Sequence, residues 1–149
     1  SDLGVEVLCM DSDNWDHHEN LPDYIAGSLS ELAQSLSAFA TDLGTQLDRV
    51  TVVVMTEFGR RAAENGSRGT DHGTASCLYL LGGGVNGGQV AGEWPGLSPD
   101  ALALGEDLAM GTDMRGVLVQ LLQRRLGYAS AASLFPGFGN ASVPDLFSA

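Results

Sequence analysis

The chain has 149 residues, which is enough for one domain with a hydrophobic core and short for two. Its 19 acidic residues outnumber its 7 basic ones, and the net charge of -12 disfavours nucleic acid and anionic membranes as partners while it attracts divalent cations. The 20 glycines are nearly twice the usual share of about 7%, which predicts long irregular connections between the regular elements.

The first expected element is a strand over residues 5–10, which is followed by a polar stretch over residues 11–20. A long helix comes next, because apolar residues recur at spacings of three and four. Asn20 is a candidate cap near its start, Pro22 suits its first turn, and Gly44 weakens the helix without ending it. The apolar face consists of Ile25, Leu29, Leu32, Leu36, Phe39, Leu43 and Leu47.

Residues 50–56 are β-branched and almost uniformly apolar, a pattern typical of a strand that is buried on both faces of a parallel sheet. Strand, helix and strand together predict a right-handed βαβ unit. Doubly wound sheets bind their ligands beyond the carboxyl ends of the strands. We therefore expect functional residues directly after residue 10 and directly after residue 56.

The rest of the chain predicts a third strand over residues 77–81, an irregular stretch over residues 82–111, and a second helix. Thr112 is the expected cap of that helix and Gly127 its C-terminal stop. Cys9 and Cys77 lie within two of the strand-like runs, so both are expected to be buried free thiols. The buried stripe of the second helix consists of Met114, Val117, Leu118, Leu121, Leu122 and Leu126.

The three histidines fall in two short segments, each of which contains an acid–histidine pair. Zinc-like ions accept imidazole nitrogen together with carboxylate oxygen. In extended backbone Asp16 and His18 point to the same side, so we favour them as ligands over His17. Asp71 and His72 diverge, which suits two neighbouring metals, or one ligand and one supporting acid. An exposed loop hydrogen bond is the simpler alternative for each pair, but the gathering of every histidine in such pairs favours metal.

Glu57 and Arg60 follow the most buried predicted strand. Glu57 suits a further metal ligand or an ion pair with Arg60, and Arg60 or Arg61 suits an anionic substrate oxygen. A plain surface ion pair fits these residues equally well. No Gly-x-Ser-x-Gly elbow presents a nucleophile, so we expect no catalytic residue in this chain. The segment 65–67 spells a glycosylation sequon, which matters only in a secreted eukaryotic protein.

Several motifs, taken in order, resemble a bacterial secreted family known as domain of unknown function 1501, and the resemblance extends over nearly the whole chain. They are Asn14-Trp15-Asp16-His17-His18-Glu19-Asn20, Thr56-Glu57-Phe58-Gly59-Arg60, Asn65-Gly66-Ser67-x-Gly69-Thr70-Asp71-His72-Gly73, Leu81-Gly82-Gly83-Gly84-Val85, Gly92-x-Trp94-Pro95-Gly96-Leu97 and Thr112-Asp113-Met114-Arg115.

This family is similar to the alkaline phosphatase-like superfamily, which includes sulfatases. The resemblance implies an α/β fold with a doubly wound, mainly parallel sheet and helices on its faces. It also implies one or two divalent metals (Zn, Mn, Mg or Ca), with Asp16 and His18 as the first ligand pair, Glu57 as the acid after the next strand and His72 as the later histidine. Asp71 would either bind metal directly or support His72.

The family is normally longer, so the resemblance implies that residues 1–149 are a single α/β module from the C-terminal part of a larger domain. The superfamily's nucleophile and its first metal-binding Asp come from an N-terminal region outside this chain, and Phe58 stands where many relatives carry a His. We therefore expect part of a metal-dependent hydrolase-like protein for phosphate or sulfate esters, inactive by itself.

The alternative is a non-catalytic secreted protein that keeps the fold and a metal site. The expected partners are a small anionic ester and the missing N-terminal part of the same protein, with neither nucleic acid nor membrane. The implied location is periplasmic or secreted.

Overall fold

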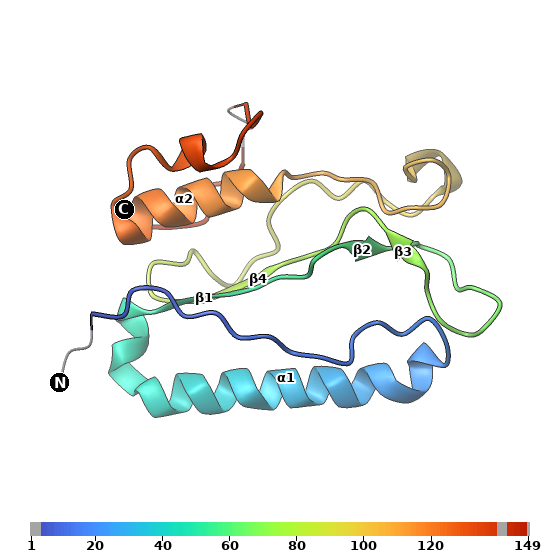
Figure 1. The fold of residues 1–149 in the computed structure, drawn as a ribbon, viewed down its shortest axis with the longest axis horizontal. Coiled ribbons are helices and arrows are strands. Elements are labelled where there is room, and N and C mark those ends of the chain that lie inside the picture. The colour runs from blue at the N-terminus through green and yellow to red at the C-terminus, as the bar shows by residue number, and fades with distance from the viewer. Residues whose placement is uncertain (1–3, 140–142, 149) are drawn as a thin grey trace.

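The computed structural model describes residues 4–139 and 143–148, in which two helices lie on opposite sides of a thin layer of strands (Figure 1). This mixture of helix and sheet is α/β overall. The helices are α1 (Leu21–Leu43) and α2 (Met114–Leu126), the strands are β1 (Thr51–Val54), β2 (Gly59–Arg60), β3 (His72–Gly73) and β4 (Tyr79–Gly82), and 3-10 helices span Gly44–Arg49, Pro99–Ala101 and Ala131–Leu134.

The strands form two small antiparallel sheets. In one, Thr51 of β1 lies opposite Gly82 of β4, and in the other, Arg60 of β2 lies opposite His72 of β3. The chain reverses direction in the β2–β3 hairpin, so β4 runs antiparallel to its neighbour β1. No parallel sheet occurs within residues 4–139 and 143–148, and the doubly wound arrangement is not seen in this part of the protein.

The strand expected over residues 5–10 does not form, and that prediction was wrong. The segment runs in the same direction as β1 and lies between β1 and α1 in Figure 1, so the path of a βαβ unit is kept without a strand at its start. Its apolar side chains are exposed, from 66% at Val7 to 86% at Met10. Cys9 and Cys77 are free thiols as predicted, but both are exposed rather than buried.

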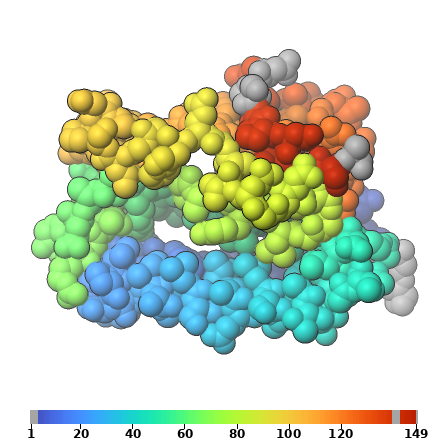
Figure 2. All heavy atoms as spheres, turned by 180° about the vertical axis from the view of Figure 1, so that it is seen from behind, coloured from blue at the N-terminus to red at the C-terminus, as the bar shows by residue number. Residues whose placement is uncertain are grey.

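Helix α1 is long but only lightly covered. Asn20 occupies the N-cap position as predicted, but its side chain makes no capping hydrogen bond, and Gly44, with a positive φ of 51°, ends the helix earlier than the apolar pattern suggested. Ile25 and Leu36 are half-buried, Leu29 is exposed, and no residue of this fully described helix is buried. Figure 2 shows α1 in blue as a ridge along the lower edge.

The total accessible surface also indicates incomplete packing. It amounts to 10390 Å², whereas a compact monomer of 15.5 kDa exposes about 7,200 Å². None of the helices in the described ranges combines the length and the hydropathy that a membrane-spanning segment needs. Exposed large apolar side chains such as Met10, Val90 and Leu104 form part of this uncovered surface.

The best-packed region surrounds α2. Val117 in α2, Ala131 and Phe147 are the buried apolar residues among those described. The segment 143–148 lies against α2, because the Gln120 amide donates to the Pro144 carbonyl oxygen at 2.7 Å and accepts from the Leu146 N–H at 3.0 Å. The tail therefore closes the small core.

Asp113, rather than the predicted Thr112, caps α2, and Gly127 ends it as predicted. The Asp113 carboxylate accepts the Arg115 N–H at 2.9 Å, and the Arg115 guanidinium lowers the pKa of Asp113. Replacing Asp113 with alanine is expected to lower the free energy of unfolding by about 1 kcal/mol at pH 7 in urea titrations. The exposed Asp11→Ala is the matched control.

The cap should respond to acid. Since the pKa of Asp113 is depressed in the folded state, its contribution is complete above the unfolded value of about 3.9 and is lost as the pH falls through the folded pKa. The stability difference between wild type and Asp113→Ala should therefore disappear in strong acid. An equal difference at pH 7 and pH 2 would mean that Asp113 acts by packing.

Candidate metal centre

The candidate site lies where the loop before α1 meets the β2–β3 hairpin. Arg60 and His72 are directly opposite each other in the hairpin, so their side chains share one face. Arg61 points to the other face, where its guanidinium pairs with the Glu106 carboxylate at 3.0 Å. The pairing register thereby selects Arg60, not Arg61, for the site.

Backbone hydrogen bonds hold the two ligand-bearing segments together. The Thr70 N–H donates to the His17 carbonyl oxygen at 3.2 Å, and the Asn20 N–H donates to the Ser67 carbonyl oxygen at 3.0 Å. The approach requires glycine at position 69, because a Cβ there would lie 2.1 Å from the backbone carbon of His18. Loop geometry thus fixes the site without help from a larger sheet.

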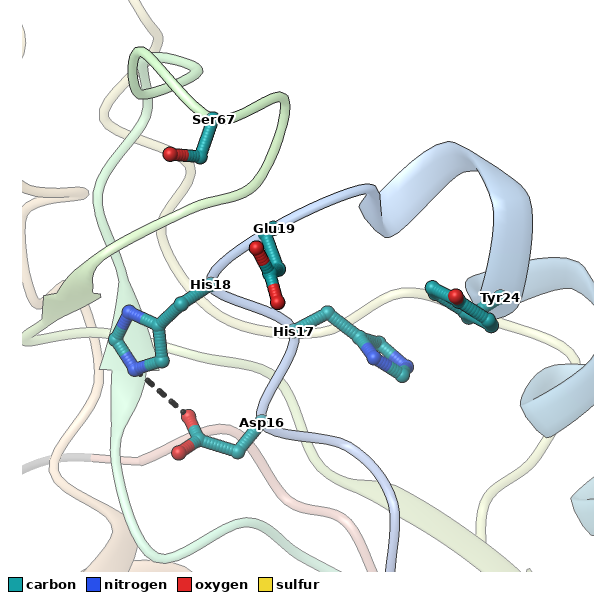
Figure 3. A pocket seen from close by; sticks show the side chains of 6 residues that line it. All are labelled: Asp16, His17, His18, Glu19, Tyr24 and Ser67. Carbon is teal, nitrogen blue, oxygen red and sulfur yellow. Dashed lines mark ion pairs between the residues drawn. The ribbon is translucent and has the colours of Figure 1, made fainter.

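Side chains alternate along the loop as the sequence predicts. Asp16 and His18 point toward one another, while His17 points away and stacks on Tyr24 with ring centroids 5.7 Å apart (Figure 3). A hollow of about 400 Å³ opens beside them. Its lining consists of Asp16, His17, His18, Glu19, Tyr24 and Ser67.

One carboxylate and two imidazoles converge on a single point. Asp16 Oδ1 lies 2.9 Å from His72 Nε2 and 3.2 Å from His18 Nε2, and the two Nε2 atoms are 2.9 Å apart. The side chains of Asp16, His18 and His72 are 61%, 43% and 49% exposed, so an ion can enter from solvent.

The donor set and its spacing fit a zinc-like ion. Atoms bound at about 2.0–2.1 Å to a tetrahedral zinc ion lie about 3.3 Å from one another, so Asp16, His18 and His72 need to separate only slightly. All three converging atoms offer a lone pair when both imidazoles are unprotonated at Nε2. A divalent cation would satisfy all three.

Arg60 is tied to the same carboxylate. Its guanidinium pairs with Asp16 Oδ1 and donates to the Thr70 carbonyl oxygen at 2.6 Å. Hydrogen bonding to His72, followed by that to Arg60, lowers the pKa of Asp16. Asp16 is therefore ionised at neutral pH, which metal binding requires.

Comparison with known proteins gives one match. Residues 2–134 match the family described as protein of unknown function (DUF1501). The chain belongs to this family. No curated protein and no solved structure matches it.

Asp71 was expected to bind metal or to support His72, but in this DUF1501 chain it faces His18 instead. Its Oδ1 lies 3.4 Å from His18 Nδ1, and the Asn65 amide donates to the same oxygen at 3.0 Å. The Asn65 hydrogen bond is the largest cause that lowers the pKa of Asp71, followed by His18. Asp71 lies outside the Asp16–His18–His72 cluster, so this geometry favours a supporting role.

Glu57 follows β1 as expected, but the cluster found among the described residues of this DUF1501 chain does not include it. The Glu57 side chain is exposed. Its neighbour Phe58 packs on the His72 ring with centroids 4.0 Å apart and so buttresses one ligand. The structure brings together donors for one metal ion and does not bring Glu57 to them.

Asn65 is the participant that the sequence analysis missed. The sequence placed Asn65 in a sequon and in a family motif without a role at the site, yet the Asn65 side chain links the two ligand-bearing segments. An Asn followed by a Gly and a Ser is typical of an Asx turn, and that signal could have indicated a structural role.

Proposed function

We propose that this chain supplies a metal centre, formed by Asp16, His18 and His72, to a longer metal-dependent hydrolase-like protein that acts on phosphate or sulfate esters. The observation that carries the proposal is the convergence of one carboxylate oxygen and two imidazole nitrogens within 4.8 Å of one another. The acidic net charge of -12 favours the capture of a divalent cation.

The chain's own residues have distinct tasks in this proposal. A bound divalent cation supplies Lewis acidity, which polarises an ester oxygen and lowers the pKa of a bound nucleophile. Asp16, His18 and His72 hold the cation, and Phe58 keeps the His72 ring in place. Arg60 places a positive charge beside the centre, which favours an anionic ester oxygen over a neutral one.

The proposal includes the remainder of a longer polypeptide, which would provide the nucleophile and cover the exposed apolar segment 5–10. It also includes an alkaline phosphatase-like, mainly parallel sheet in the whole protein. The common direction of residues 5–10 and β1 supports it, as does the accessible surface of 10390 Å². A periplasmic or secreted location stays a prediction from the family resemblance.

A second candidate is a non-catalytic binding or structural protein that retains the metal. The Phe58 ring, which packs against His72, favours this candidate. An apolar side chain there cannot serve as a ligand for a second metal ion beside the first. The two candidates share the metal and differ in catalysis.

Hydrolysis of 4-nitrophenyl phosphate and 4-nitrophenyl sulfate, measured on the longest polypeptide that contains this chain, tests the proposal. We expect Zn²⁺- or Mn²⁺-dependent hydrolysis of one ester and its loss in His72→Ala. The exposed Glu57→Gln is the matched control and should retain activity. Metal binding without hydrolysis of either ester would favour the non-catalytic candidate, and a wild type that binds no metal would overturn both.

A further inference from the structure

We propose that Asn65 is a positioning residue, which acts through Asp71 to keep the His18 imidazole turned with Nε2 toward Asp16 and His72. The inference rests on the proposed metal centre and adds a requirement for it. Neither Asn65 nor the Asn65–Asp71 link touches the point where the three ligand atoms converge.

The Asn65 side chain is fixed by its own loop. Its Oδ1 accepts the N–H groups of Ser67 at 2.9 Å and of Gly69 at 3.0 Å, and its backbone N–H donates to the Gly69 carbonyl oxygen at 2.9 Å. Because backbone N–H groups can only donate, the amide oxygen must face them. The Nδ2 group therefore faces the opposite way, toward the ligand-bearing loop.

Both hydrogens of Nδ2 have acceptors. One goes to the His18 carbonyl oxygen at 2.9 Å and the other to Asp71 Oδ1 at 3.0 Å. The same amide group thus holds the backbone of one metal ligand and the carboxylate that faces its ring. A single side chain thereby couples residues that lie 53 positions apart in the sequence.

Two carboxylates face opposite nitrogens of the His18 ring, with Asp71 Oδ1 at 3.4 Å from Nδ1 and Asp16 Oδ1 at 3.2 Å from Nε2. Asp16 Oδ1 already pairs with the Arg60 guanidinium, whereas Asp71 is held against the ring by the Asn65 amide, so in this proposal Nδ1 is the protonated nitrogen and donates to Asp71. A neutral imidazole has one N–H, so Nε2 keeps its lone pair, and this is the atom that lies 2.9 Å from His72 Nε2. Mutation of a residue that orients a ligating histidine in this way typically lowers the metal affinity by about 10–100-fold.

The informative substitution is Asn65→Asp, which keeps an oxygen for Ser67 and Gly69 but turns the donor facing Asp71 into a repelling acceptor. In the metal-free protein at pH 8, ¹⁵N shifts of the His18 ring should show Nδ1 protonated in wild type and a gain of the Nε2-protonated form in the variant. Zn²⁺ affinity, measured against a competing chelator, should fall about 10–100-fold.

Asp71→Ala, at a half-buried position, removes the other end of the link and should give the same two changes even if Asn65→Asp does not fold. Asn86→Asp makes the same substitution far from the site, where the Asn86 amide donates to the Asp145 carbonyl oxygen, and should change neither. Unaltered His18 tautomers in folded Asn65→Asp and in Asp71→Ala would overturn the proposal.

The two hypotheses fail separately. If wild type bound no Zn²⁺, the proposed function would be lost, whereas the ¹⁵N shifts of the metal-free protein would still decide the role of Asn65. If Zn²⁺ bound with equal affinity to wild type and to both variants, the metal centre would stand and the role of Asn65 in metal binding would not.

Discussion

Replacing His72 with alanine is expected to lower the affinity of the chain for Zn²⁺ by more than about 100-fold, the upper end of the range for residues that only support a ligand. His72 Nε2 lies 2.9 Å from both Asp16 Oδ1 and His18 Nε2, so it supplies one of three converging donors. Competition with a chromophoric chelator measures the change directly, and calorimetry gives the stoichiometry, which we expect to be one ion per chain.

Two substitutions serve as controls for this experiment. Glu57→Gln removes an exposed carboxylate that follows β1, and it should leave the affinity within about twofold, since the cluster among the described residues does not include Glu57. His17→Ala removes a histidine that faces Tyr24 instead of the centre and should not lower the stoichiometry. An affinity loss for Glu57→Gln equal to that for His72→Ala would contradict the three-ligand centre and restore Glu57 as a ligand.

Replacing Phe147 with alanine is expected to lower the free energy of unfolding by about 3–5 kcal/mol, because it leaves a cavity where the structure packs best. Phe147 is 0% exposed and pairs with Val85 through an isolated bridge. With stabilities of about 5–15 kcal/mol for whole domains, such a loss removes a large part of the total. Urea unfolding followed by far-ultraviolet circular dichroism measures the change.

Phe39→Ala in α1 is the matched control, because it makes the same chemical change at an exposed position. Its effect on the free energy of unfolding should stay below about 1 kcal/mol. Similar losses for Phe39→Ala and Phe147→Ala would mean that α1 is packed as firmly as the region around α2, against the burial observed in the structure.

The shared orientation of Asp16 and His18 could be predicted because it depends on simple alternation along the chain. Asp16 and His18 share a side of the loop and His17 lies on the other, which is the alternation that the sequence predicts, although the N–H groups of His17 and His18 bond the carbonyl oxygens two residues earlier. The partner of Asp71 could not be predicted this way. Which histidine it faces depends on how the hairpin meets the loop before α1, and His18 lies far from Asp71 in sequence.

The fold was harder to predict than the proximity of Asp16 and His18. Strands β2 and β3 have two residues each, too few for any alternation to be visible, so the hairpin that carries Arg60 and His72 left no sequence pattern. For residues 5–10 the apolar run predicts a strand, which does not form. Pairing needs an adjacent edge at the right register, and composition carries no information about that.

The light coverage of α1 has a consequence for amide hydrogen exchange. A helix with no buried residue opens at low free energy, so its amides should exchange well before those of α2. The amides of Asn20 and Leu21 should be slower than the middle of α1, since they donate to the Ser67 and Arg68 carbonyl oxygens. The loop that carries Asp16 and His18 can then stay folded against the hairpin while the helix it leads into unfolds and refolds.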